Sequence, residues 1–148
     1  MQPASPGGTE TILVIDDEEI IRTSLSTYLS GLGYRVLQAE DGEVGLDVYR
    51  QHQDEVDLVL ADLSMPQVSG EEVLRTLRNL DVELKVMIFT GYNSDAHAVD
   101  ESLPVITKPA KASVVARQIR EVLNAGQSDH FFLALRAIIS ARVKSAEP

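Results

Sequence analysis

The 148-residue sequence contains no cysteine. This absence excludes a disulfide-stabilised scaffold, a thiolate metal site and a cysteine nucleophile. No apolar run approaches the ~18 residues of a membrane helix. Met1 to Thr9 contain no basic residue, so the N-terminus lacks the charged and apolar regions of a secretory signal. We therefore expect a cytoplasmic protein without a membrane span, with residues 1–9 as a disordered leader.

Basic residues are scarce: 13 Lys and Arg stand against 23 Asp and Glu, a net charge of −10. Residues 1–102 hold 6 basic and 20 acidic side chains, a net of −14, whereas residues 103–148 hold 7 and 3, a net of +4. An acidic body repels phosphate backbones, which argues against direct nucleic-acid binding and suits a divalent cation. The length and the apolar share of 44% favour one globular domain.

Short apolar runs predict five strands, and apolar residues at helical spacing predict helices between them. The runs cover residues 11–15, 34–39, 56–61, 84–89 and 105–107. The helical patterns lie within residues 21–32, 44–49, 73–77 and 115–123, and the weakly apolar stretch 93–101 predicts a short fourth helix. Strands that alternate with helices favour right-handed crossovers and a parallel sheet with helices on both faces.

Chemically active side chains follow four of these strands. Asp16 and Asp17 follow the first, Asp62 the third, Thr90 the fourth and Lys108 the fifth. Ligands bind beyond the carboxyl ends of strands in such sheets, so we expect these residues to converge. Two unit charges at ~4 Å repel by ~4 kcal/mol at an effective dielectric constant near 20, so the carboxylates need protons, a lysine or a metal.

The chemistry of this residue set favours phosphoryl transfer. Oxygen-only ligands select a hard cation such as Mg²⁺. The Lys108 ammonium supplies a positive charge for one phosphoryl oxygen, and the Thr90 hydroxyl can donate to another. One carboxylate would then be the nucleophile.

These residues resemble the receiver domains of two-component response regulators. The resemblance spans roughly residues 10–124, in the order of the family. The matching pieces are Val14 to Glu18, Asp57 to Asp62, Met65-Pro66 with Gly70, Thr90, and Lys108-Pro109. It implies a flavodoxin-like, doubly wound α/β fold with a five-stranded sheet of order 2-1-3-4-5.

The resemblance also implies a role for each site residue. Asp62 would accept a phosphoryl group from a phosphohistidine of a sensor histidine kinase or phosphotransfer protein. Asp17, Asp62 and the backbone carbonyl of Ser64 would ligate Mg²⁺, with Asp16 acting through a metal-bound water. Thr90 and Lys108 would hold phosphoryl oxygens. Such a protein is a phospho-acceptor with self-phosphorylation and self-dephosphorylation activity, and it signals by binding an unidentified protein partner.

One region departs from the family pattern. Receivers commonly carry an aromatic residue three positions before the lysine that follows strand five, and here this position is Val105. The sequence from Phe89 to Tyr92 resembles a subgroup of receivers with Thr-Gly-Tyr after strand four and a reduced fourth helix. Tyr92 is a candidate substitute for the missing aromatic residue.

Other interpretations stay open. Asp16 and Asp17 are also suited to cap the helix that follows them. The chain is alternatively a phosphorylation-independent interaction module of the same fold, or the receiver part of a longer regulator or hybrid kinase. A haloacid-dehalogenase-type phosphatase would need a second Asp two residues after Asp62, where Ser64 stands. His52, His97 and His130 lack ligand spacing and are expected to face solvent.

Residues 126–148, after a receiver over residues 10–125, predict an amphipathic helix or linker. Its apolar stripe comprises Phe131, Phe132, Leu135, Ile138, Ile139 and Val143, with Arg136, Arg142 and Lys144 among the other positions. This helix would cover apolar surface of its own domain, form a homodimer or partner contact, or lead to an output domain. A basic helix on an acidic body is also suited to dock against the active-site face of a neighbour.

Overall fold

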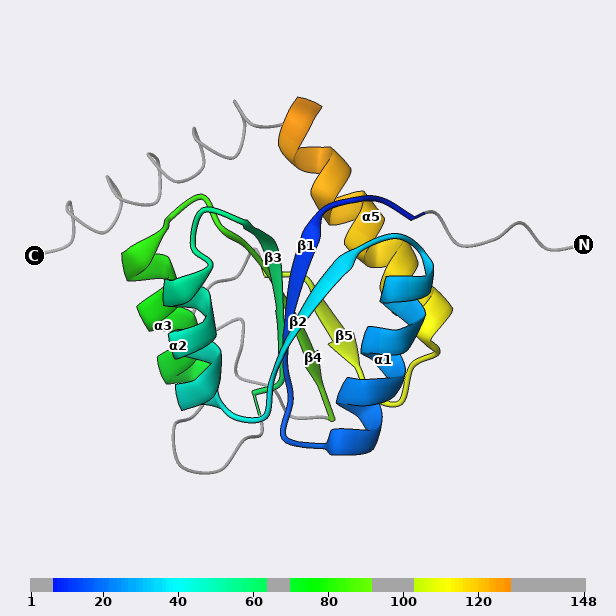
Figure 1. Cartoon of the computed structure of the whole chain (residues 1–148), viewed down its shortest axis with the longest axis horizontal. Coiled ribbons are helices and arrows are strands. Elements are labelled where there is room, and N and C mark those ends of the chain that lie inside the picture. Colours follow the sequence, from blue (N-terminus) through cyan, green and yellow to red (C-terminus); the bar gives the residue numbers. More distant parts are fainter. Residues whose placement is uncertain (1–6, 64–69, 92–102, 129–148) are drawn as a thin grey trace, which may run out of the picture.

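The computed structural model describes residues 7–63, 70–91 and 103–128, with side chains up to residue 125. Its five strands form one parallel sheet of order β2-β1-β3-β4-β5 (Figure 1). The strands are β1 (Thr11–Ile15), β2 (Arg35–Ala39), β3 (Val56–Ala61), β4 (Lys85–Thr90) and β5 (Val105–Thr107). The predicted flavodoxin-like order 2-1-3-4-5 is confirmed.

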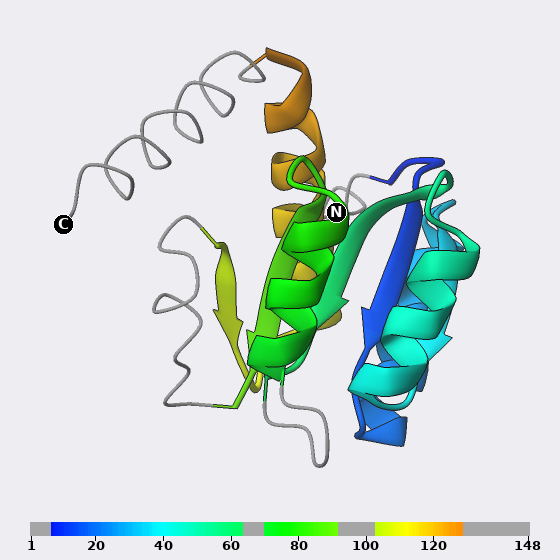
Figure 2. The same ribbon diagram turned by 90° about the vertical axis from the view of Figure 1, so that its left-hand side faces the viewer.

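Four described helices cover the two faces of this sheet. They are α1 (Glu19–Gly31), α2 (Gly42–Gln51), α3 (Gly70–Leu80) and α5 (Ala112–Ser128). Helices α1 and α5 lie on one face and α2 and α3 on the other (Figures 1 and 2). The helix expected within residues 93–101 and the segment beyond residue 128 lie outside the described residues. Within the described residues, every helix falls short of the length and apolar character that a membrane span requires.

The two faces of the sheet bury separate apolar clusters. Leu13 and Ile15 of β1 face the cluster under α2 and α3, whereas Ile12 and Val14 face the cluster under α1 and α5. All four side chains are at most 2% exposed. This alternation explains why the central strands are apolar at nearly every position, since both of their faces are covered.

The starts of β2 and β4 differ from the sequence prediction by one residue, and the backbone hydrogen bonds show why. The N–H of Tyr34 donates to the carbonyl of Leu29 at the end of α1 (3.3 Å), so β2 begins at Arg35. Likewise the N–H of Leu84 donates to the carbonyl of Asp81 (3.4 Å), and β4 begins at Lys85. Both amide groups belong to turns that precede the strands.

The Asp41-Gly42 pair, a sequence typical of a turn, lies at the start of a helix. The Asp41 side chain accepts a hydrogen bond from the N–H of Val44 at 2.8 Å and so caps α2, whose first residue is Gly42. At the end of α1, Gly33 adopts a φ of 104°, a backbone conformation that favours glycine. These two turns set the path of β2, the edge strand beside β1.

Candidate phosphoryl-transfer site

The site residues lie at one edge of the sheet because parallel strands all end there. Asp62 directly follows β3, and its N–H donates to the carbonyl of Ile15 in β1 at 3.0 Å. Lys108 directly follows β5, and its N–H donates to the carbonyl of Thr90, the last residue of β4, at 2.7 Å. Backbone hydrogen bonding thus continues past the ends of the strands and fixes the backbone positions of Asp62 and Lys108.

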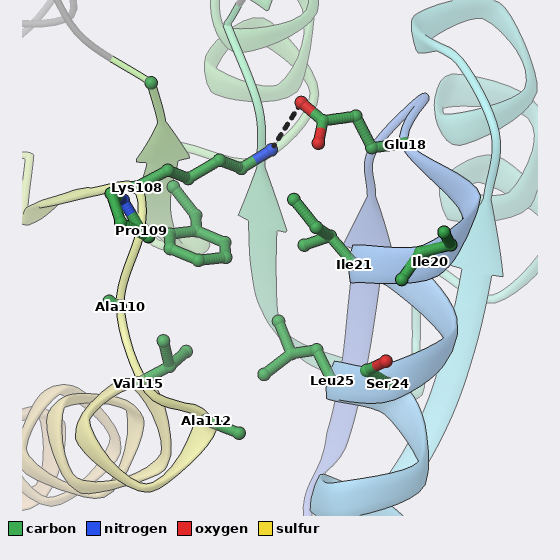
Figure 3. A pocket seen from close by; sticks show the side chains of 12 residues that line it. Glu18, Ile20, Ile21, Ser24, Leu25, Lys108, Pro109, Ala110, Ala112 and Val115 are labelled. Atoms are coloured by element: carbon green, nitrogen blue, oxygen red, sulfur yellow. Dashed lines mark ion pairs between the residues drawn. The ribbon is translucent and has the colours of Figure 1, made fainter.

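The Lys108 side chain lies at the centre of the site. Its Nζ is 2.8 Å from Asp16 Oδ2 and 3.2 Å from Asp62 Oδ2, and it donates to both carboxylates. The same Nζ lies 3.5 Å from Glu18 Oε1 (Figure 3) and 5.3 Å from the centre of the Phe89 ring. The Lys108 side chain is only 9% exposed, so little water screens these charges.

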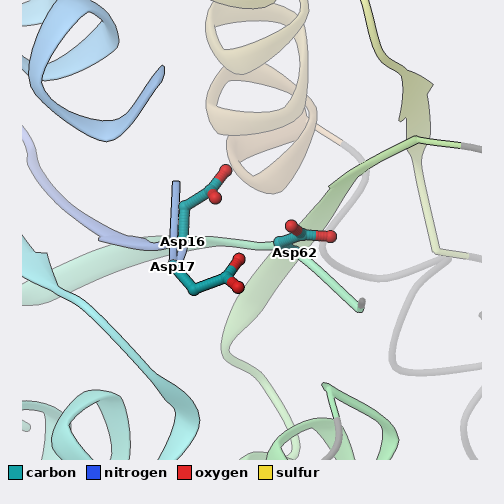
Figure 4. A group of neighbouring side chains, drawn as sticks. All are labelled: Asp16, Asp17 and Asp62. Atoms are coloured by element: carbon teal, nitrogen blue, oxygen red, sulfur yellow. The ribbon is translucent and has the colours of Figure 1, made fainter. Parts of the chain in front are cut away.

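Three carboxylates converge beside this ammonium group. Asp16 and Asp17, from the β1–α1 turn, and Asp62, from the end of β3, each offer one oxygen, and these oxygens lie within 4.8 Å of one another (Figure 4). Asp16 and Asp62 are each 2% exposed, whereas Asp17 is exposed. Hard divalent cations such as Mg²⁺ take oxygen ligands of this kind, so the cluster fits such an ion.

Burial and charge shift the ionisation of the buried groups. Burial raises the pKa of Asp16, although the Lys108 ammonium and the N–H of Glu18 act in the opposite direction. Burial lowers the pKa of Lys108, but contacts with Asp16 and Asp62 outweigh it, so the pKa of Lys108 lies above its usual value. Lys108 is therefore a permanent cation at neutral pH. With three carboxylates and one ammonium group, the ionised site carries an excess negative charge that a metal ion can offset.

The β1–α1 turn is held by contacts of its own. Asp16 Oδ1 accepts a hydrogen bond from the N–H of Glu18 at 2.9 Å. The Arg22 guanidinium, one turn into α1, donates to the backbone carbonyl of Asp16 at 2.7 Å. Asp16 thus supports the start of α1 while it contacts Lys108, so the capping interpretation and the site interpretation are compatible. The N-cap position itself is Glu18, whose side chain makes no capping bond.

Thr90 is also at this edge, as the last residue of β4, and is 1% exposed. Val105, the position that departs from the family pattern, is half-buried in β5 opposite Ile88 and packs against the cluster under α2 and α3. Ser64 and Tyr92 lie outside the described residues.

Three further contacts were absent from the sequence prediction: Glu18 and Phe89 beside Lys108, and Arg22 at the Asp16 carbonyl. The contact of Arg22 with the Asp16 carbonyl could have been predicted from the position of Arg22 in the sequence. Arg22 lies one helical turn beyond the acidic pair, where a long side chain on the first turn of a helix can reach back to the preceding loop. His52, expected to face solvent, is half-buried and lies 3.2 Å from Glu55, while His97 and His130 lie outside the described residues.

Residues 12–120 match the family model of the response regulator receiver domain. Sensor kinase CckA of Brucella abortus is 31% identical over 120 residues, which are 78% of this chain and 13% of CckA. The chain spans about half or less of the length of the first curated relatives it matches.

Solved structures agree in fold. A response regulator receiver domain protein from Clostridium thermocellum has a TM-score of 0.73 at 29% identity, covering 80% of this chain and 97% of that one. Response regulator protein TrrA of Thermotoga maritima, in complex with Mg²⁺ and BeF, has a TM-score of 0.70 at 28% identity, covering 77% of this chain and 99% of that one. On the family match, the fold and the converging acidic residues, this chain belongs to the response regulator receiver domain family.

Proposed function

We propose that this chain accepts a phosphoryl group on Asp62 from a phosphohistidine of a sensor histidine kinase or phosphotransfer protein, in a step that depends on Mg²⁺. The observation that carries the proposal is the position of Lys108 Nζ, which contacts both Asp16 and Asp62 within a cluster of three carboxylates. A buried ammonium group beside a carboxylate nucleophile is suited to stabilise a transferred phosphoryl group.

In the proposed reaction a carboxylate oxygen of Asp62 attacks the phosphorus atom. The O–P bond forms as the N–P bond of the phosphohistidine breaks, and the released imidazole nitrogen takes the electron pair of that bond. Lys108 donates to one phosphoryl oxygen, and the Thr90 hydroxyl donates to a second. Lys108 is already in place for this role, since its ammonium lies 3.2 Å from an Asp62 oxygen.

We propose that Asp17 and Asp62, with the carbonyl of Ser64, hold Mg²⁺, and that Asp16 contacts it through a water molecule. The residues fit Mg²⁺ because all the ligand atoms that the three carboxylates offer are oxygens. One oxygen of each carboxylate lies close enough to the others for all three to bind one ion. When bound, Mg²⁺ would neutralise charge on the phosphoryl oxygens. TrrA, solved with Mg²⁺ and BeF, supports this assignment by its similarity.

The finer classification is part of the same proposal. On the sequence from Phe89 to Tyr92, we propose that the chain belongs to the receiver subgroup with Thr-Gly-Tyr after strand four and a reduced fourth helix, and that Tyr92 takes over the role of the aromatic residue that Val105 replaces. The output would be the binding of another protein. Because the relatives include both a sensor kinase and a transcriptional regulatory protein, the partner is not specified by the family alone.

The test is incubation of the full chain with MgCl₂ and acetyl phosphate, followed by intact-mass measurement. We expect a gain of one phosphoryl group in the wild type and none in Asp62→Asn. Asp57→Asn is the matched control, because Asp57 is an exposed aspartate on the same strand and should leave phosphorylation intact. Equal phosphorylation of Asp62→Asn and wild type would overturn the assignment of the acceptor.

The alternative, an interaction module that does not use phosphorylation, is favoured by the replacement of the usual aromatic residue by Val105 and by the weakly apolar stretch 93–101, where the fourth helix is expected. It predicts the same affinity for a binding partner with and without phosphorylation. The phosphoryl analogue BeF₃⁻ separates the two functions. Added with Mg²⁺, it should shift the NMR signals of β4 and β5 residues if the site is active and leave them unchanged otherwise.

A further inference from the structure

An apolar groove lies beside the acidic site. It has a volume of about 530 Å³ and runs between α1 and the segment that leads from β5 into α5 (Figure 3). Its lining includes Ile20, Ile21, Leu25, Ala110, Ala112 and Val115. Glu18 and Lys108 stand at one end of the groove, so the groove opens next to the residues proposed to handle phosphate.

The groove leaves apolar surface in contact with water. Ile20 is 82% exposed, and Val114, next to the groove wall, is 37% exposed. Exposed apolar surface framed by polar residues is typical of a contact site. The neighbouring end of α1 is acidic, because Asp17, Glu18 and Glu19 are all exposed. A suitable occupant therefore combines an apolar face with positive charge.

Residues 129–148 have this combination in their sequence. Phe131, Leu135 and Ile139 recur at intervals of four, Ile138 and Val143 lie close to the same stripe, and the segment carries three basic residues against two acidic ones. Arg142 and Lys144 come late in the segment. The order along the chain is therefore apolar first and basic towards the end.

The length of the segment matches the distance it has to cover. Helix α5 starts at Ala112 beside the groove and runs for 17 residues to Ser128, at the opposite edge of the sheet (Figure 1). A helical segment that reverses direction after Ser128 rises by the same ~1.5 Å per residue. It would bring residues 138–143 level with residues 114–119, in the first two turns of α5, where Val115 lines the groove. Arg142 would then stand level with Val115, on the side of Ser24 and Leu25 (Figure 3), from where a long side chain extends towards the acidic start of α1.

We propose that residues 129–148 fold back on the same chain and cover this groove. The apolar side chains of Ile139 and Val143 would pack between α1 and the start of α5. The positive charge of Arg142, which shares a helix face with Ile138 and Ile139, would be directed towards the acidic start of α1, whereas Lys144 would lie on the other side of the helix. This contact is separate from the proposed function, because it requires no phosphorylation of Asp62.

Because the sequence contains no cysteine, the reaction of a single introduced thiol can be measured without a contribution from other thiols. Ser24 lines the groove and is exposed, so Ser24→Cys puts the only thiol of the full chain where the segment would cover it. The rate of its reaction with a thiol reagent is measured without any phosphoryl donor. We expect a reaction roughly tenfold slower than in the chain that also carries Ile139→Asp and Val143→Asp, because the reagent reaches a covered thiol only when the segment is undocked.

Two matched controls accompany this comparison. Ala137→Asp and Ala141→Asp add the same charges at the same spacing on the opposite side of the stripe, and should leave the slow reaction unchanged. Ser30→Cys places the thiol at an exposed serine near the other end of α1, and its rate should be insensitive to the substitutions at 139 and 143. Circular dichroism of each variant verifies that the domain stays folded.

Equal Ser24→Cys rates with and without the aspartates at 139 and 143 would overturn the proposal. Protection that increases with protein concentration would also overturn it, since the segment would then cover the groove of a second copy. Protection that is independent of concentration and lost only in the 139/143 variant supports it. A failure of this test leaves phosphorylation of Asp62 unaffected, so it is distinguishable from a failure of the proposed function.

Discussion

At the residue scale, the balance of charge around Lys108 governs the site. One ammonium group faces Asp16 and Asp62 directly, while Asp17 adds a third carboxylate from the exposed side. Each carboxylate repels the other two, and Lys108 compensates only part of this repulsion. The site is therefore suited to bind a cation. Without a cation, the repulsion among the carboxylates lowers the stability of the folded protein.

We predict that Asp17→Asn stabilises the protein in the absence of divalent cations, by roughly 0.5–1 kcal/mol. The substitution removes repulsion from the two buried carboxylates, and solvent screening at this exposed position keeps the gain small. Urea unfolding in the presence of EDTA measures it. A loss of stability under these conditions would show that Asp17 makes a favourable contact instead.

The same variant should lose the stabilisation by Mg²⁺. We expect the wild type to gain ~1.4 kcal/mol at a free Mg²⁺ concentration tenfold above the Kd, since the proposed ion would bind the folded state and not the unfolded chain. Repeating the urea titration with MgCl₂ tests this, and NaCl of equal ionic strength controls for screening.

Sequence reasoning identified Asp16, Asp17, Asp62, Thr90 and Lys108, and the structure places all five at one edge of the sheet. The predicted convergence is observed because strand order and direction alone bring these positions together. The sequence prediction missed the contact of Lys108 with Glu18 and the Phe89 ring, because that contact depends on which rotamer a long side chain adopts.

At the element scale, the turns between strands and helices hold the site in place. The two described residues that follow β3, Asp62 and Leu63, lie close to the first residue of α3. A Cβ atom added at Gly70, the first residue of α3, would lie less than 3.0 Å from the Cα of Leu63 and from the carbonyl oxygen of Asp62. Only glycine permits this approach without a backbone shift.

We therefore predict that Gly70→Ala lowers the free energy of unfolding by about 1–3 kcal/mol and slows phosphorylation of Asp62, whose backbone has to move. Gly31→Ala is the matched control, because an added Cβ at the last residue of α1 meets nothing within 4 Å. It should be neutral or stabilising by up to about 1 kcal/mol. Urea unfolding and the intact-mass assay give the two measurements, and equal effects of both substitutions would contradict the prediction.

Whether a segment forms a helix or a strand was predictable where its apolar pattern was long. The residues at which these elements begin were not predictable. Tyr34 and Leu84 are as apolar as the strands that follow them, yet their N–H groups bond to preceding turns. Gly42 reads as a turn residue in the sequence, but the cap by Asp41 makes it the first residue of α2. Local hydrogen bonds determine these boundaries, and the hydrophobic periodicity of the sequence does not reveal those hydrogen bonds.

At the scale of the whole molecule, an ion pair joins the start of β1 to α5. The Arg120 guanidinium donates to the carboxylate of Glu10, with 3.0 Å between Nη1 and Oε1, and also to the carbonyl of Gly7 at 3.2 Å. The side chains of Glu10 and Arg120 are 26% and 17% exposed. The pair spans 110 positions of the chain, a separation at which sequence patterns give no pairing signal.

This pair predicts a pH-dependent contribution to stability. The hydrogen bond from Arg120 holds the pKa of Glu10 below its ordinary value of about 4.5. A carboxyl group with a lowered folded pKa stabilises the fold above its unfolded pKa, and this contribution disappears as the pH falls through the folded value. Glu10→Gln should therefore lower the free energy of unfolding by about 1 kcal/mol at pH 7 and have little effect at pH 3.

Urea unfolding of both proteins at the two pH values provides the measurement. Glu55→Gln is the control: Glu55 is a half-exposed surface residue in a pair with Arg35, and its substitution should have a smaller effect at pH 7. A Glu10→Gln effect of the same size at both pH values would show that packing, and not charge, is responsible.

The first residue of β1 and the last residue of α5 both lie at the edge of the sheet farthest from Asp62 (Figure 1). Any domain fused at either junction would start on the side away from the carboxylates. The receiver domain can thus be joined to very different polypeptides without changes in the loops that carry the Asp62 site. This geometry accounts physically for how one module of this size serves as a small part of a kinase in one relative and as half of a transcriptional regulator in another.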